Sequence, residues 1–167
     1  MAGVCEEFDT GPGGGFVFYD AGSRQSWGRY LEAAPKGWSG SPDDPGKQWC
    51  APGQRGYKSF LASGTGIGSG ASNTALVVQN CGTDTAAGLA ADYRGGGKSD
   101  WFLPSKDELM KVYDRRSEIG ALVDDGFWSS SQGDVIDDGA WCQNLDDGTQ
   151  LEGYKSTVSR VRPVRAF

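Results

Sequence analysis

The stretch 128–167 constrains the fold more than any other part of the chain, because it combines two kinds of sequence. Aromatic, small or alternating residues of the kind that build strands occupy 128–131, 140–141 and 160–167. Short polar runs separate these groups, and Asp-Asp-Gly, which favours chain reversal, recurs just before and within this region. It occurs at 124–126, 137–139 and 146–148. The pattern predicts strand, turn, strand, turn, strand, with the polar runs displayed on a rigid framework.

Further strands are expected near both ends of the chain. A glycine-rich turn at 11–15 opens into an aromatic strand at 16–19, and a second strand is expected at 27–34. A final strand is expected over 158–164, where valines lie among arginines. Pro163 places that strand at an edge or a bulge, because proline cannot donate to a sheet ladder.

The middle of the chain predicts loops and helices. The segment 36–55 is rich in Gly, Pro, Ser and Asp, which is typical of a long loop. Helices are expected over 74–80, 83–93 and 106 to about 117. The third begins with a capping box, in which the Ser105 hydroxyl and the Glu108 carboxylate bond backbone amides reciprocally.

A glycine ladder at 64–70 has two interpretations. Bare backbone amides can approach an anion closely, as in a phosphate cradle. The ladder lacks the Gly-Lys-Ser/Thr ending of a P-loop, and no clear strand precedes it. We therefore favour a loop that runs into a helix.

Size and charge exclude several classes of protein. A chain of 167 residues is expected to form one domain, 1–167, with 1–9 as a leader. The net charge of −6 argues against nucleic acid or an anionic membrane as the main partner. No apolar run is long enough for membrane insertion, and no signal peptide opens the chain.

The cysteines favour disulfides over zinc. The four cysteines are widely spaced, with no CxxC pair and no histidine. One or two disulfides are expected, with Cys50–Cys81 favoured over Cys5–Cys142, although spacing alone leaves the connectivity open. Disulfides favour an extracytoplasmic setting.

Five segments resemble a known bacterial family, the domain at the C-terminus of the Lcl collagen-like adhesin, which also occurs in many surface proteins. These segments are 10–19, 31–35, 101–109, 128–131 and 160–167, in order along nearly the whole chain. The resemblance implies an α+β domain of C-type lectin-like fold. It further implies paired N- and C-terminal strands, two to three helices and a long loop region.

The tail 128–167 also resembles that of variable proteins diversified by retroelements, which are lectin-fold binders. The matching anchors are 128–130, 140–141, 148–150, Lys155 and 160–165. Between them lie residues that an adenine-mutagenised Asn codon can reach, so this resemblance implies that 128–167 is a variable, ligand-displaying region. It would also make Cys142 a diversified position and a free thiol.

These observations favour a noncatalytic, extracellular ligand-binding domain of adhesin or receptor-recognition type, on a cell surface or a phage fibre. Its partner would be a host or cell-surface protein or a glycan. The candidate contact residues are Asp137, Asp138, Trp141, Asn144, Asp146, Asp147, Thr149, Leu151, Tyr154 and Ser156, with Trp141 as a stacking platform. The alternative for each is a purely structural role, as a turn residue or in the core.

Three further alternatives remain. One is a fixed-specificity glycan-binding domain; the adhesin's sulfated ligands fit poorly, because the loops are acidic and the basic residues Arg160, Arg162 and Arg165 are expected to be paired. Another is a homotrimeric structural cap of a fibre. The third is an enzyme, which we do not expect, because no histidine is available as a general base and the Asp residues lie in turns.

No cofactor is expected, with calcium as the one alternative. Calcium takes six to eight oxygen ligands. Several could come from Asp137, Asp138, Asn144, Asp146 and Asp147. The sugar-binding motifs of true C-type lectins are absent.

Overall fold

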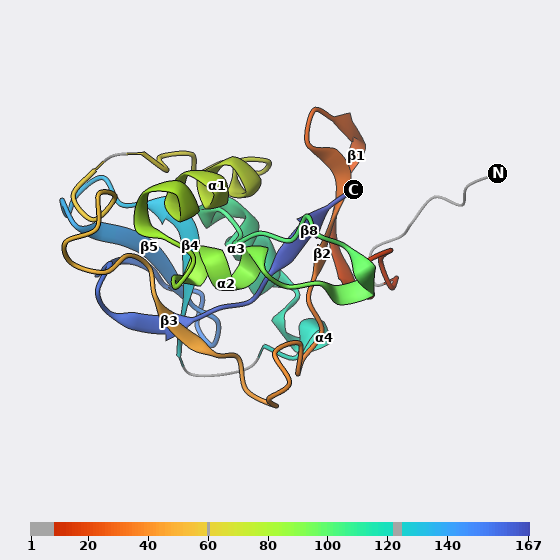
Figure 1. The fold of residues 1–167 in the computed structure, drawn as a ribbon. Helices are drawn as coiled ribbons and strands as arrows, with labels where there is room; N and C mark the ends of the chain where they lie inside the picture. Colours follow the sequence, from red (N-terminus) through yellow and green to blue (C-terminus); the bar gives the residue numbers. More distant parts are fainter. Residues whose placement is uncertain (1–8, 60, 122–124) are drawn as a thin grey trace.

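The computed structural model describes residues 9–59, 61–121 and 125–167, which form four α-helices and eight strands in two sheets (Figure 1). The expected α+β class is confirmed. The strands are β1 (Phe16–Gln25), β2 (Gly28–Ala33), β3 (Gly46–Gln48), β4 (Gly126–Gln132), β5 (Gly139–Asn144), β6 (Gln150–Tyr154), β7 (Val158–Arg160) and β8 (Val164–Ala166). The helices are α1 (Gly70–Cys81), α2 (Ala86–Ala91), α3 (Lys106–Asp114) and α4 (Arg116–Ile119), with a 3-10 turn, η1, at Gly95–Gly97.

The smaller sheet, which we call the terminal sheet, has the order β1-β2-β8 and joins the two ends of the described chain. All its pairs are antiparallel, and β8 lies beside β2, with Leu31 opposite Ala166. The N- and C-terminal strands are therefore in one sheet, and β2, rather than the strand at 16–19, is the direct partner of β8. Residues 9 and 10 already belong to this fold, because Val17 N donates to Asp9 O and Thr10 bridges Phe16. The rest of the expected leader lies outside the described residues.

The larger sheet has the order β3-β7-β4-β5-β6. Only β4 and β7 run parallel, and β4, β5 and β6 form the predicted strand–turn–strand meander. Turns at 137–139 and 146–148 connect these strands as expected, whereas part of 124–126 lies outside the described residues. The prediction of one final strand over 158–164 is wrong. The chain leaves β7 at Arg160, passes Pro163, which lacks an amide hydrogen for a ladder, and enters the terminal sheet as β8.

The helices differ from the prediction at their ends. The capping box is confirmed: Ser105 Oγ accepts from Glu108 N at 3.3 Å, and Glu108 Oε2 accepts from Ser105 N at 2.7 Å. The predicted helix to 117 is divided at Arg115 into α3 and the short α4. No described helix is long and apolar enough to cross a membrane.

The glycine ladder at 64–70 faces an anion that belongs to the chain itself. Glu108 Oε1 accepts from Gly68 N at 2.8 Å and from Gly70 N at 3.4 Å, at the start of α1. A Cβ on Gly70 would lie 2.2 Å from Glu108 Oε2, so glycine is required for this approach. The amides that could have bound a phosphate are therefore hydrogen-bonded to the Glu108 carboxylate. Helix α1 begins earlier than predicted because its first amides have this partner.

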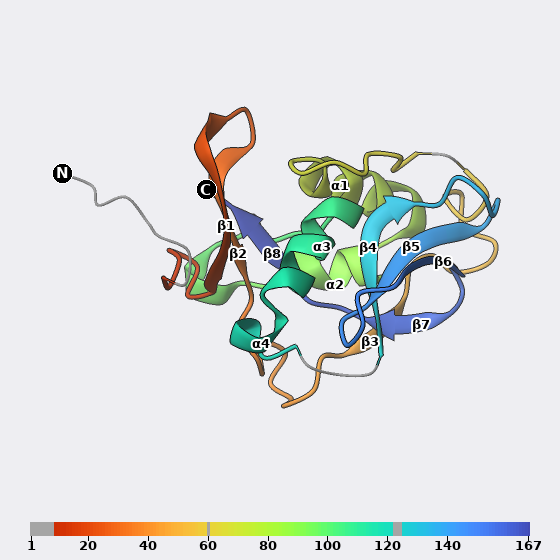
Figure 2. The same cartoon turned by 180° about the vertical axis from the view of Figure 1, so that it is seen from behind.

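Two buried hydrophobic clusters form the core. One packs between the larger sheet and helices α1 and α2, and contains Trp49, Trp128 and the confirmed disulfide Cys50–Cys81. The other includes residues of α3 and of the terminal sheet. Figure 2 shows the ribbon of these elements from behind. Cys142 is a buried free thiol, and Cys5 lies outside the described residues.

A buried carboxylate joins the glycine-rich turn 11–15 to the C-terminal strand. Glu32 is fully buried and accepts from Gly13 N at 2.9 Å and Gly15 N at 3.0 Å. Its Oε1 also accepts from Arg165 Nη1 on β8 at 2.9 Å. A Cβ on Gly13 or Gly15 would lie within 2.8 Å of Glu32 or of the Ala33 carbonyl, which explains the run of glycines.

We expect Glu32→Ala to lower the free energy of unfolding by about 3–5 kcal/mol, because it leaves Arg165 and two amides without their buried partner. The matched control is Asp20→Ala, which also removes a carboxylate bonded to an arginine, Arg29, but at a site that is partly open to solvent. Urea unfolding followed by tryptophan fluorescence would measure both. Equal losses in the two variants would contradict the structural role of Glu32.

Candidate functional site

Buried framework and exposed side chains alternate along 126–158. Trp128, Ser130, Ala140 and Lys155 are at most 1% exposed. Five large hydrophobic side chains are exposed among the described residues, and four of them lie in this stretch. They are Val135 (83%), Leu151 (49%), Tyr154 (57%) and Val158 (62%). The stretch therefore presents apolar side chains from a fixed scaffold.

The buried serines of β4 are part of that scaffold. Ser129 Oγ donates to Trp141 O on β5 at 2.8 Å, and Ser131 Oγ donates to Gly64 O at 2.7 Å. Ser131 Oγ also accepts from Lys106 N, at the start of α3, at 2.9 Å. Small hydroxyl side chains thus join β4 to β5, to the glycine ladder and to α3.

The loop 133–138 is held by the carboxylate of Glu152 on β6. Oε1 accepts from Asp134 N at 2.9 Å and from Val135 N at 3.1 Å, and Oε2 accepts from Ile136 N at 2.8 Å. Partial burial raises the pKa of Glu152, but these three amides outweigh it, so the pKa lies below its ordinary value. Val135 is thus exposed on a loop of fixed shape.

Lys155, in the turn after β6, hydrogen-bonds to the loop 50–59. Its fully buried ammonium donates to Gly56 O at 3.0 Å and Tyr57 O at 3.1 Å, and lies 4.8 Å from the centre of the Trp49 ring. Burial lowers the pKa of Lys155 to about 8, against an opposing effect of the Asp138 carboxylate. The loop 50–59 is thereby joined to the turn after β6.

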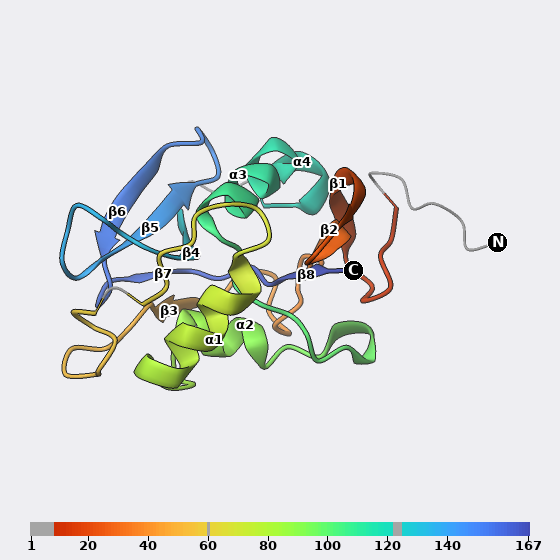
Figure 3. The same cartoon turned by 90° about the horizontal axis from the view of Figure 1, so that it is seen from above.

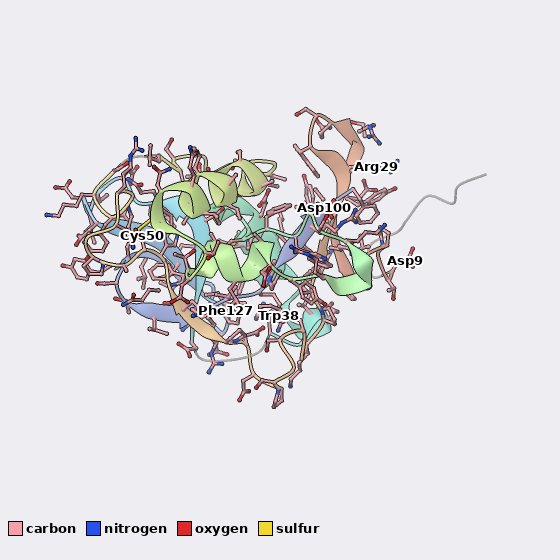
Figure 4. All side chains as sticks on the ribbon, in the orientation of Figure 1. Asp9, Arg29, Trp38, Cys50, Asp100 and Phe127 are labelled. Atoms are coloured by element: carbon pink, nitrogen blue, oxygen red, sulfur yellow. A yellow bond between two sulfur atoms is a disulfide. The ribbon has the colours of Figure 1, made fainter. Side chains whose placement is uncertain are left out.

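These loops lie at one end of the molecule. In Figure 1 the segments 50–59, 61–64 and 133–138 are at the left, and the terminal sheet is at the right. Figure 4 shows the same separation, with Cys50, whose amide donates to Lys155 O, far from Arg29 and Asp9. We call this end, formed by 56–59, Leu61, 133–138 and 154–158, the loop end.

The structure divides the predicted contact residues into two groups. The group at the loop end contains Asp137, Asp138, Tyr154 and Ser156. The group at the opposite tip of the β5–β6 hairpin contains Asn144, Asp146, Asp147 and Thr149. The two remaining residues, Trp141 and Leu151, lie on the strands between these groups. Since β5 has six residues, the two groups are roughly 17 Å apart along the strand. The five calcium candidates therefore do not form one site, and no group of three metal-ligating side chains exists within 9–59, 61–121 and 125–167.

At the hairpin tip, polar side chains stabilise the turn. Asn144 Oδ1 accepts from Asp146 N at 2.7 Å, and Asp147 Oδ1 accepts from Thr149 N at 2.8 Å. Hydrogen bonds from the Thr149 backbone and side chain lower the pKa of Asp147 below its ordinary value. The side chains of Asn144 and Asp147 therefore have the geometry of turn residues, which is the alternative to a role in ligand contact.

Trp141 is half-buried, and one face of its ring is covered. The Lys106 ammonium lies 3.4 Å from the ring centre, a cation–π contact. Gln150 on β6 holds this lysine's backbone, because Gln150 Nε2 donates to Lys106 O at 3.0 Å. That face of the indole therefore already has a partner within the chain, and the role of Trp141 as a stacking platform stays a prediction.

The C-terminal arginines are paired, as expected. Each lies on a carboxylate: Arg160 on Asp125, Arg162 on Asp44, and Arg165 on Glu32 and Asp100. Arg162 is 1% exposed, so it serves the fold rather than a surface. These side chains do not form an open basic patch for a sulfated glycan.

Sequence reasoning missed the roles of five residues that form the loop end or hold it in place. Val135 lies inside a polar run, Leu61 lies outside the tail, and the partners of Glu152 and Lys155 are distant in sequence. Val158, at the start of β7, had been assigned to a final strand without its exposure being recognised. A signal existed only for Val135, as an apolar residue among aspartates.

Compared with models of known protein families and with curated proteins, the sequence has no significant match. The resemblances seen in the sequence therefore support a proposal of function but do not assign the chain to a family.

The pKa of Lys155 predicts an unusual pH dependence. Between pH 8 and about 10.5 the folded protein releases this proton and the unfolded chain keeps it. The free energy of unfolding therefore rises with pH in this window, by at most about 3 kcal/mol from this group.

Lys155→Met, of similar length, should lose this rise, and urea unfolding at several pH values would compare the two proteins. Tyrosine titrations affect both proteins and cancel in the difference. Identical pH slopes would contradict the prediction.

Proposed function

We propose that this chain is a noncatalytic, extracellular ligand-binding domain that recognises a cell-surface protein or a glycan through the loop end. One observation carries the proposal: within 126–158, large apolar side chains are exposed next to fully buried framework residues such as Trp128, Ala140 and Lys155. Exposed aromatic and apolar side chains on rigid supports lose little conformational entropy on binding. The disulfide Cys50–Cys81 is consistent with an extracellular location.

The resemblance to C-type lectin-like domains and to retroelement-diversified proteins supports the same proposal. Several anchors of that resemblance, such as 128–130, Ala140, Lys155 and Arg162, are buried, and the exposed residues Val135, Leu151 and Tyr154 lie between anchors. A scaffold with this division tolerates changes at exposed positions, because its stability comes from the buried ones. We therefore propose that the tail is diversified.

A noncatalytic role fits the placement of the acidic residues. The two carboxylates of a glycosidase are about 5–9.5 Å apart. Here the pairs Asp137–Asp138 and Asp146–Asp147 are separated by the length of β5, roughly 17 Å. A fixed-specificity glycan-binding domain is the second candidate, favoured by the exposed ring of Tyr154.

Binding should depend on the loop end and not on the terminal sheet. We expect the labelled protein to bind a target on arrays of glycans and extracellular proteins, and the double variant Val135→Asp/Tyr154→Ser to weaken this by roughly tenfold or more. The control is Arg24→Ser on the exposed part of β1, which should leave binding unchanged. EDTA should also have no effect.

Binding that survives the double variant, or that is lost in the control, would overturn the proposal. Melting temperatures of the variants should match that of the wild type, since every changed side chain is exposed.

Diversification has a separate test in the DNA beside the gene. We expect a near-copy of codons 128–167 that carries adenines where the gene differs, next to a reverse transcriptase. Its absence would leave a fixed-specificity binder, the second candidate.

A further inference from the structure

Strand β6 forms an open edge of the larger sheet. It is the last strand in the order β3-β7-β4-β5-β6 and lies on the outer side of β5 (Figure 3). Its five residues pair with β5 without a register shift. The other edges are shorter or irregular: β3 and β8 have three residues each, Phe102 bridges Val164 of β8, and β1 carries two register shifts.

The register shows which backbone groups of β6 face outward. Asn144 N donates to Thr149 O at one end of the β5–β6 pair, and Lys155 N donates to Asp138 O at the other. Hydrogen-bonded pairs alternate along an antiparallel ladder, so Leu151 and Gly153 exchange their bonds with β5. The N–H and C=O groups of Gln150 and Glu152 therefore point away from the sheet, where no described strand pairs with them.

This edge lacks the usual protection against added strands. Natural edges carry lysine, proline, bulges or inward-pointing charges. β6 has no lysine, proline or bulge, and the one charge on it, Glu152, is bound by the loop amides of 134–136. On the two faces of the strand, Leu151 (49% exposed) and Tyr154 (57%) offer apolar contacts to a neighbour.

The negative charge near β6 indicates which kind of partner strand can pair with this edge. Exposed aspartates flank both ends of β6, at Asp134 and Asp137 in one loop and at Asp146 and Asp147 in the other. No lysine or arginine occurs between Arg116 and the buried Lys155. A second copy of the chain would bring the same aspartates together, whereas a basic segment would be attracted to them.

We propose that β6 binds an extended, positively charged segment of a partner protein as an added strand. This deepens the proposed function, on which it rests, by naming a polypeptide as the ligand class. Backbone bonds to Gln150 and Glu152 supply the pairing, and Leu151 and Tyr154 select apolar side chains of the segment.

The test uses a short synthetic peptide that alternates lysine with valine and threonine, titrated into the isotope-labelled protein and followed by NMR. We expect shifts centred on β6 and slower hydrogen exchange at the amides of Gln150 and Glu152. A peptide with glutamate in place of lysine should bind roughly tenfold more weakly or not at all.

Two variants of one residue separate strand addition from other contacts. Gln150→Pro and Gln150→Ala both lose the side-chain bonds to Lys106 and to Gln143 of β5, but only proline removes the outward amide, and neither removes a backbone hydrogen bond to β5. We expect the proline variant to bind the peptide roughly tenfold more weakly than the alanine variant.

Each other outcome overturns the inference. These outcomes are no binding of the basic peptide, shifts away from β6, no protection of the two amides in the wild type, equal binding by the two variants, and a dimer of the chain formed through β6. The amide-exchange result needs no variant, so it decides even if Gln150→Pro does not fold. The array target separates the two proposals. If the loop-end double variant abolishes binding to this target but Gln150→Pro does not, the proposed function stands and the strand-addition proposal is wrong.

Discussion

The fold depends on side-chain carboxylates that accept backbone amides from loops. Glu32 holds the glycine-rich turn before β1, Glu108 holds the start of α1, and Glu152 holds the loop after β4. In each case an acid on a strand or helix replaces water as the partner of amides that a loop cannot satisfy by itself. Glycines at 13, 15, 68 and 70 let the backbone approach the first two carboxylates.

The same principle explains how a loop-rich chain can present a defined surface. The loops that form it are tied down by Glu152 and Lys155, whose charges are taken up by backbone groups rather than offered to a ligand. The loops are therefore already ordered in the folded protein, and a ligand does not have to offset the entropy cost of ordering them. The exposed residues include apolar side chains, such as Val135 and Tyr154, beside the aspartates that flank the open edge of β6.

Local features were predictable from the sequence, and distant partners were not. The capping box and the turns at 137–139 and 146–148 depend on neighbouring residues, and both were found. The bond from Gly68 to Glu108 spans 40 residues and that from Lys155 to Gly56 spans 99, so no local pattern reveals them. For the same reason the cover of Lys106 on Trp141 was missed, and the candidate residues looked contiguous although β5 separates them.

The buried free cysteine on β5 has a consequence for how this domain behaves in an oxidising medium. Burial raises the pKa of the Cys142 thiol to about 11. At neutral pH only about one molecule in ten thousand carries the thiolate, which is the form that attacks disulfides and oxidants. The Cys142 thiol is therefore a weak nucleophile and can stay reduced while Cys50 and Cys81 form their bridge.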